Sequence, residues 1–123
     1  MRAVIFEVEP AEGRRGAYLA LAAQMRPLLE AQPGFLSVER FESLSQPGKL
    51  LSLSVFADEA GVAGWRTLRE HRGVPAAGRG GLFAGYRLRV AEVLRDYGLH
   101  DRAQAPVDSR AFHSGGYSGL HPL

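Results

Sequence analysis

Trp65, His71 and Arg72 have side chains that could together bind and activate a small organic molecule. Trp65 is the only tryptophan, and it is interpreted either as a wall of a pocket or as a core aromatic, two roles that overlap. His71 could accept a proton near neutral pH, and Arg72 could stabilise the resulting anion. The structural alternatives are that His71 complements a helix dipole and that Arg72 is solvated. His71 and Arg72 are therefore the predicted catalytic residues, and Trp65 is a predicted substrate contact.

Tyr86, Arg87 and Arg89 form a second group of candidates in an alternating segment. The alternation places Tyr86 on one face of a strand with Leu88 and Val90, so Tyr86 is predicted to be buried and to contact a substrate. Arg87 and Arg89 fall on the other face, where each needs an acidic partner or an anionic ligand. Structural ion pairing is favoured, and Arg87 is kept as a substrate-binding candidate. The carboxylates available for such pairs are Glu7, Glu39 and Glu42.

The sequence lacks the motifs of metal binding, phosphate binding and thiol chemistry. His100, His113 and His121 are spaced too irregularly to predict a metal site. The stretch Gly78-Arg79-Gly80-Gly81 lacks the Lys-Ser/Thr end and the preceding strand of a phosphate-binding loop. There is no cysteine, so thiol chemistry and disulfides are excluded. The prediction is a protein without a bound metal or cofactor.

The composition indicates one soluble domain. The chain has 123 residues, 46% of them hydrophobic, which is enough for a core in a domain of this size. Acidic and basic residues alternate and the net charge is only +2, so a nucleic-acid partner is not expected. No run of about 18 apolar residues predicts a membrane span, and the start lacks the apolar run of a signal peptide. A cytoplasmic location is the expectation.

Apolar periodicity predicts an order of elements that defines a fold class. Strands are expected over residues 2–9, 35–44, 50–56 and 86–97, and helices over residues 13–32 and 59–71. Asp58 is expected to cap the second helix, and the glycine-rich residues 73–85 to form a loop with at most one helical turn. The order β-α-β-β-α-β predicts an α+β, ferredoxin-like domain with a four-stranded antiparallel sheet and both helices on one face.

The predicted hairpin is apolar on both faces. Leu51, Leu53 and Val55 point one way, and Leu50 and Phe56 point the other. Two helices can cover only one face of the sheet, and an uncovered apolar face is typical of an interface. Sheet-to-sheet pairing of two copies is therefore expected, giving a homodimer.

Residues 1–99 are predicted to form the domain and residues 100–123 a C-terminal tail. The tail is rich in Gly, Pro, Ser and His and shows no clear periodicity. We expect that it is not an independent domain. Its apolar side chains Phe112, Tyr117 and Leu120 could dock on a partner subunit.

Several different short motifs follow one another along residues 2–98. They are Pro33-Gly34-Phe35, Val38-Glu39, Phe41, Lys49-Leu50-Leu51-Ser52-Leu53, Trp65, Glu70-His71-Arg72, Ala77-Gly78-Arg79 and Phe83-Ala84-Gly85-Tyr86-Arg87-Leu88-Arg89-Val90. In order and spacing they resemble the antibiotic biosynthesis monooxygenase domain family. The resemblance implies a dimeric α-β barrel, in which two ferredoxin-like sheets face each other.

The resemblance implies several activities, because members include cofactor-free oxygenases of aromatic polyketides, haem-degrading enzymes and isomerases. The first hypothesis is a cofactor-independent monooxygenase acting on a small phenol- or quinol-type aromatic molecule. The alternative is a non-catalytic dimeric protein that binds a small molecule or acts in stress, which a pocket filled by side chains would favour. Haem degradation is disfavoured, because Pro75 stands where such members carry their iron-binding histidine.

Overall fold

The structure is a computed structural model that describes residues 1–114, with side chains described up to residue 110. The chain divides into two compact units, the first spanning Met1–Glu92 and the second beginning at Val93. The elements of the first unit are β1 (Arg2–Pro10), α1 (Arg15–Glu30), β2 (Phe35–Glu42), β3 (Leu50–Phe56), α2 (Glu59–His71), α3 (Val74–Ala77), η1 (Gly78–Leu82) and β4 (Phe83–Glu92). The predicted α+β ferredoxin-like fold is confirmed.

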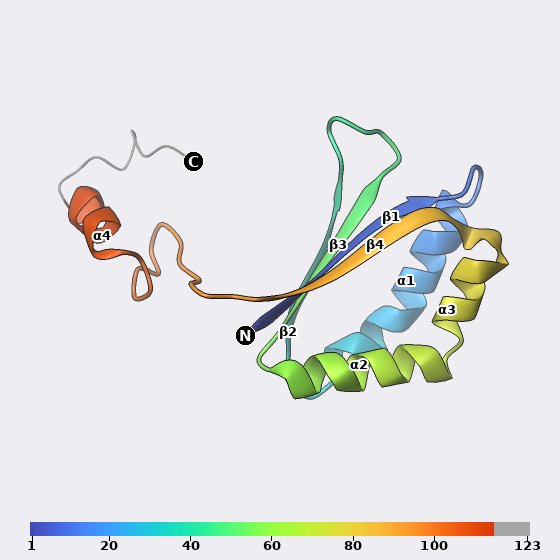
Figure 1. Cartoon of the computed structure of the whole chain (residues 1–123), viewed down its shortest axis with the longest axis horizontal. Coiled ribbons are helices and arrows are strands. Elements are labelled where there is room, and N and C mark those ends of the chain that lie inside the picture. Colours follow the sequence, from blue (N-terminus) through green and yellow to red (C-terminus); the bar gives the residue numbers. More distant parts are fainter. Residues whose placement is uncertain (115–123) are drawn as a thin grey trace. The chain divides into compact units, whose positions relative to one another are not determined.

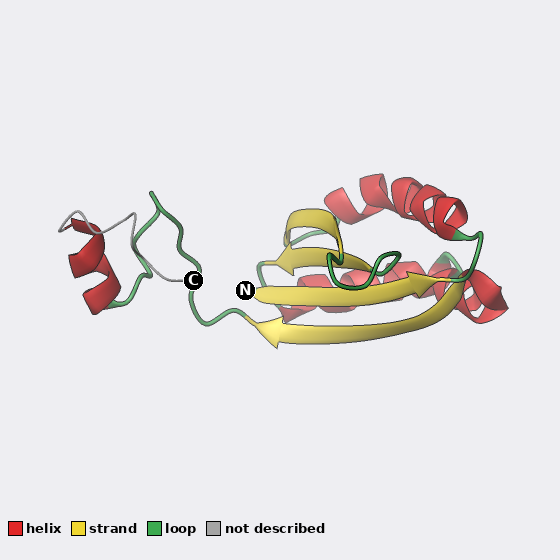
Figure 2. Cartoon of the chain, turned by 90° about the horizontal axis from the view of Figure 1, so that it is seen from above, coloured by secondary structure: helices red, strands yellow, loops and turns green. Residues whose placement is uncertain are grey.

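The four strands form one antiparallel sheet in the order β2-β3-β1-β4. β1 is central and pairs with β3 and with β4, although it comes first in the sequence. The outer position of β4 beside β1 is visible in Figure 2. Because β4 is an edge strand, its side chains have neighbouring strand residues on one side only.

Both long helices lie on the same side of the sheet, as Figure 1 shows. One core cluster joins Leu29 of α1 and Trp65 of α2 to Val4 of β1 and Phe56 of β3. The side chains of Val8 and Phe56 are completely buried. The apolar stripes expected on the helices and on alternate strand positions therefore meet in one layer, which is the main source of stability in a domain of this size.

Local signals position α2 against β3. Asp58 caps the helix as predicted, because its Oδ1 accepts a hydrogen bond of 2.9 Å from the Gly61 backbone N–H. Gly61 allows a close approach to the sheet. A Cβ there would lie 3.0 Å from the Pro33 carbonyl oxygen and 3.1 Å from the Phe56 ring. The start of α2 is thus held by one cap and one glycine.

The last strand differs from its predicted bounds of 86–97. β4 begins at Phe83, because this segment already pairs with the end of β1, and it ends at Glu92, which pairs with Arg2. Beyond Glu92 there is no further β1 residue to pair with. The predicted loop before β4 contains two short helical elements, α3 and η1, with Gly81 at a φ of 97°.

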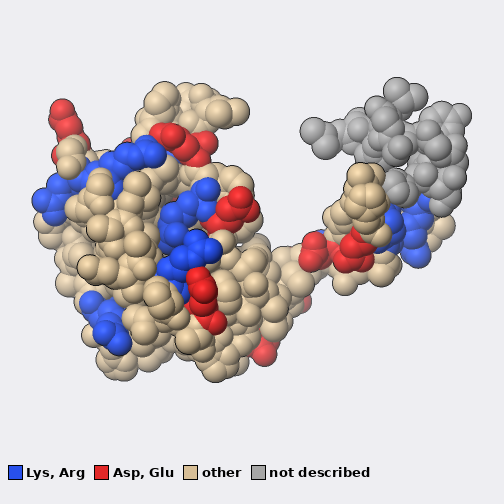
Figure 3. Space-filling model, turned by 180° about the vertical axis from the view of Figure 1, so that it is seen from behind, with Lys and Arg blue, Asp and Glu red and all other residues tan. Residues whose placement is uncertain are grey.

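The helix-free face of the sheet carries apolar and charged residues together. The strand register places the following residues on it: Phe41, Leu51, Leu53, Val55, Ala3, Ile5, Glu7, Arg87, Arg89 and Ala91. Glu7 forms ion pairs of 3.5 Å with Arg89 and with Lys49. The predicted structural ion pairing is confirmed for Arg89. On the face seen in Figure 3, basic and acidic side chains also lie close together.

The described part of the second unit includes the helix α4 (Val107–Ser114), in a segment whose sequence predicts no regular element. Within this unit Arg102 lies 5.3 Å from the Tyr97 ring centroid and donates a hydrogen bond of 2.8 Å to Ser109 Oγ. Of the predicted docking residues, Tyr117 and Leu120 lie outside the described residues, as does the side chain of Phe112. Among residues 1–114, no helix is long and apolar enough to span a membrane.

Candidate functional site

A cavity of about 480 Å³ opens between the sheet and the helices α2 and α3. Its volume is within the range of pockets that hold small organic ligands. The residues that line it are Phe6, Arg66, Arg69, Glu70, Val74, Pro75, Gly78, Arg79, Phe83, Ala84, Gly85, Tyr86 and Leu88. The cavity exists because the helices cover β1 and β3 but leave β4 partly bare.

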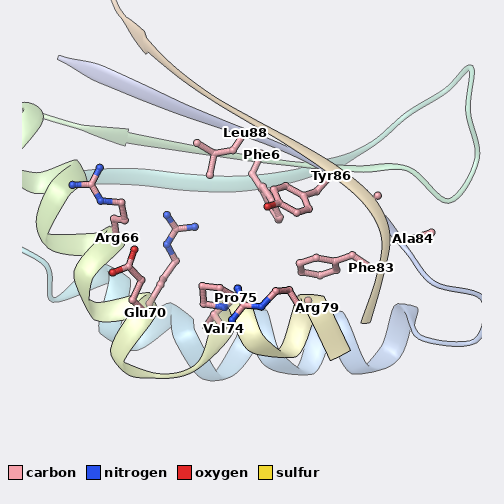
Figure 4. Close-up of a pocket in the computed structure, with 13 residues that line it drawn as sticks. Phe6, Arg66, Glu70, Val74, Pro75, Arg79, Phe83, Ala84, Tyr86 and Leu88 are labelled. Atoms are coloured by element: carbon pink, nitrogen blue, oxygen red, sulfur yellow. The ribbon is translucent and has the colours of Figure 1, made fainter. Parts of the chain in front are cut away.

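Aromatic rings form one end of the cavity. The ring centroid of Phe6 lies 5.9 Å from that of Phe83 and 5.7 Å from that of Tyr86, and the Phe83 and Tyr86 centroids are 6.0 Å apart. Figure 4 shows these three rings gathered near the start of β4, while Arg66 and Glu70 project from α2 at the other end. Such a cluster can hold a flat aromatic ligand by apolar and ring contacts.

A smaller inner cavity of about 100 Å³ lies next to the larger one, deeper between the helices and the sheet. Phe6, Arg69, Val74 and Phe83 line both cavities, so the two are contiguous. Trp65 borders the inner cavity and also belongs to the core, so its position is compatible with both interpretations.

The charged residues around the two cavities are mostly basic. They are Arg40, Arg66, Arg69, Arg79 and Glu70. Burial lowers the pKa of Arg69, because the charged form loses water; Glu70 opposes this shift and Arg66 adds to it. The Arg69 guanidinium carbon lies 5.9 Å from the Trp65 ring centroid, a cation–π distance. The cavities are therefore suited to a ligand with an anionic group.

The predicted site residues occupy three places. Trp65 and Tyr86 border the inner and the larger cavity, respectively. Arg87 borders a separate hollow of about 200 Å³, which Glu7 and Tyr86 also line. His71 and Arg72 are exposed at the end of α2 and line neither of the two contiguous cavities. The structure thus brings Trp65 and Tyr86 to one helix–sheet space.

Tyr86 is not buried as predicted. Its side chain shares a face with Leu88 and Val90, as expected, but 68% of Tyr86 is exposed in the single chain. The reason is the edge position of β4, since no helix packs fully over this strand. An exposed tyrosine beside a cavity is available to a ligand.

Sequence reasoning missed Arg40, Arg69, Phe6 and Phe83. Arg69 carried a usable signal, because it follows Trp65 by four positions and so lies on the inner face of α2. Arg40 carried no clear signal, because the β2–β3 register shifts between Phe35 and Ser37 and changes which residues of β2 face the helices.

Pro75, at the position where haem-degrading relatives are expected to carry a histidine, lines the larger cavity. The described residues contain no cluster of three or more His, Asp or Glu that could hold a metal ion.

Comparison with known proteins matches residues 1–75 to the family model of the antibiotic biosynthesis monooxygenases. The chain belongs to this family. Among curated proteins, a jasmonate monooxygenase of Pyricularia oryzae is 42% identical over 93 residues, which is 76% of this chain and 43% of that protein. The protein YqjZ of Bacillus subtilis, which is uncharacterized, is 33% identical over 93 residues, 76% of this chain and 79% of its own length. The chain therefore spans less than half of the jasmonate monooxygenase.

Solved structures show the same family fold. A protein of Deinococcus radiodurans superposes with a TM-score of 0.70 at 14% identity, over 80% of this chain and 97% of that one. Rv0793 of Mycobacterium tuberculosis superposes with a TM-score of 0.69 at 22% identity, over 79% and 98% of the two chains. At these identities the likeness establishes the fold alone.

Proposed function

We propose that this antibiotic biosynthesis monooxygenase family member is a cofactor-independent monooxygenase that acts on a small phenol- or quinol-type aromatic molecule. The observation that carries the proposal is the open cavity of about 480 Å³ with Phe6, Phe83 and Tyr86 at one end. The family name and the printed activity of the Pyricularia oryzae relative support the reaction type.

The chemistry needs an electron-rich substrate rather than a redox group of the protein. Once deprotonated, such a substrate can give electrons to oxygen. At an anthrone-type CH₂ carbon, one oxygen atom becomes the carbonyl, and the other leaves as water with the two hydrogens. The protein then has to exclude water and stabilise the substrate anion. Arg66, Arg69 and Arg79 are the cationic side chains at the larger cavity that can do so.

His71 and Arg72 are the predicted proton acceptor and anion-stabilising residue. Both residues are exposed and follow Glu70, which lines the larger cavity. Substitution of His71 tests the assignment. If His71 is the general base, His71→Ala should lower turnover about 10²–10⁴-fold and leave binding nearly unchanged. Equal turnover in the wild type and the variant would exclude His71 from the reaction.

The test of the function is oxygen uptake by metal-stripped protein with a panel of hydroxyquinones and anthrones. We expect uptake without added flavin, metal or nicotinamide. Tyr86→Ala should weaken substrate binding, while Leu19→Ala, an exposed change on α1 away from the cavities, should not. Binding of the aromatic panel without any oxygen uptake would instead support the non-catalytic binding protein.

We also infer that the protein is a homodimer paired through the helix-free face of the sheet. Leu51, Leu53 and Val55 lie on this face, whereas Phe56 packs under the helices and is part of the core. Sedimentation at micromolar concentration should give twice the chain mass. Leu53→Glu should produce a monomer and Leu19→Glu should not; a monomeric wild type would contradict the inference.

A further inference from the structure

Two arginines line the inner cavity, one from the sheet and one from a helix. Arg40 comes from β2, where it pairs with Ser52 on the helix-covered side of the sheet. Arg69 comes from α2, one turn after Trp65. Both line the cavity of about 100 Å³ together with apolar side chains and two serines.

Neither arginine forms a salt bridge within the described side chains, although the charge of Glu70 favours the charged form of Arg69. The Nε atoms of Arg40 and Arg69 are fully shielded and make no hydrogen bond to the described part of the chain. The residues lining the inner cavity include no carboxylate, and the ion pairs of the first unit involve Lys49 and other arginines. Both side chains are partly buried, and an Nε that has lost water without gaining a hydrogen bond is less favourable than a paired one.

The surroundings of Arg40 and Arg69 indicate which chemical group of a ligand could bind between them. Burial lowers the pKa of Arg69, so a neighbouring negative charge would be favourable there. The inner cavity is small, so it admits a group of a few atoms. A planar carboxylate suits the fork of N–H donors on a guanidinium. The adjoining cavity of about 480 Å³ has room for the rest of a small molecule.

We propose that Arg40 and Arg69 bind the carboxylate of the ligand in the inner cavity, while its aromatic body lies against Phe6, Phe83 and Tyr86. The two parts of the ligand would meet at Phe6 and Phe83, which line both cavities. The proposal rests on the proposed function for the aromatic body. The carboxylate site itself follows from the arginine pair.

Calorimetric titration of the full-length protein with 2-naphthoate and 2-naphthamide tests the charge requirement, because the probes differ mainly in charge. We expect 2-naphthoate to bind at least about tenfold more tightly, as is typical for a hydrogen-bonded ionic group. Quenching of the single tryptophan, Trp65, gives a second signal from the cavity itself.

Arg40→Met and Arg69→Met should each reduce the preference for 2-naphthoate to about twofold or less. Arg14→Met is the control, because Arg14 is an exposed arginine that lines neither cavity, and it should keep the preference. Arg69→Lys keeps the positive charge and should retain part of the preference for 2-naphthoate. This variant tests the site if a methionine variant does not fold.

Equal affinity of the wild type for the two probes would overturn the carboxylate site. So would an unchanged preference in both methionine variants, or tighter binding of 2-naphthyl phosphate than of 2-naphthoate. Failure of the proposed function is distinguishable. Arginine-dependent binding with no oxygen uptake on any substrate would remove the oxygenase and leave the site. Oxygen uptake on the aromatic panel, together with equal affinity for 2-naphthoate and 2-naphthamide, would remove the site and leave the oxygenase.

Discussion

The space between the helices and the sheet has a closed half and an open half. In the closed half, Phe56 of β3 belongs to the core cluster with Val62 and has none of its surface exposed. Three other members of the cluster, Val4, Leu29 and Trp65, also border the inner cavity. In the open half, the same helix-covered side of β3 carries Ser52 and Ser54, and the inner cavity lies beside them. The strands and helices are continuous through both halves.

The comparison shows that side-chain size, rather than backbone arrangement, decides where this fold is hollow. A phenylalanine fills the gap between the layers, whereas two serines leave room that Arg40 and Arg69 only partly occupy. Cores are packed to crystal-like density, so a gap of this kind reflects the choice of residues. The closed half supplies stability and the open half supplies a binding space.

Truncation in the closed half should have the largest effect on stability. Phe56→Ala should lower the free energy of unfolding by about 3–5 kcal/mol, because it removes a fully buried ring and leaves a cavity. Tyr86→Ala in the open half should cost less than about 1 kcal/mol, because the side chain is largely exposed. Urea unfolding of both variants measures the difference. Equal losses would mean that the two halves do not differ as described.

Filling the open half should reduce binding more than stability. Ser52→Val adds apolar volume beside Arg40 and should weaken 2-naphthoate binding about tenfold, as a misplaced methylene does in other pockets. The free energy of unfolding should change by less than about 1.5 kcal/mol. The measurements are titration calorimetry and urea unfolding, with Ser45→Val in the exposed turn as the control. Unchanged binding would place the ligand elsewhere.

Removing an unpaired charge from the open half should stabilise the ligand-free protein. Arg69→Met should raise the free energy of unfolding by about 1 kcal/mol, because methionine keeps much of the packing without a shielded charge. Arg79→Met, a change at an exposed arginine, should stay within about 0.5 kcal/mol of the wild type. Destabilisation by Arg69→Met would indicate that Arg69 is part of the core rather than of a ligand site.

The smallest effect should come from a surface pair outside both cavities, where Arg15 donates a hydrogen bond of 2.7 Å to Glu42 and connects α1 to β2. This bond and the charge of Arg15 lower the pKa of Glu42. Because the folded pKa is lowered, the contribution to stability is present above the unfolded pKa and is lost as the pH falls through the folded value. Arg15→Ala should therefore be slightly less stable than the wild type at neutral pH and equal to it in acid.

NMR titration of Glu42 in the wild type and in Arg15→Ala measures this shift directly. Lys49→Ala is a suitable control, because Lys49 pairs with Glu7 and not with Glu42. A Glu42 pKa that is the same in the wild type and in Arg15→Ala would show that the ion pair does not persist in solution.

Much of the fold could be predicted from local patterns. Alternation placed Leu50 and Phe56 opposite Leu51 and Leu53, and the N-cap signal placed the start of α2 at Asp58. These features depend on the period of one element or on the chemistry of a few neighbouring residues. The end of β4 could not be predicted, because it depends on where its partner β1 begins at Arg2.

The sequence by itself determined the order of the elements and the apolar face of each, since strand and helix periodicity are properties of a single segment. Tertiary structure alone decided the site. Arg40 and Arg69 belong to different layers, and their lack of a carboxylate partner within the described residues becomes visible only when the layers pack. Likewise, Tyr86 lies on the predicted face but is exposed, because a face is buried only where another element covers it.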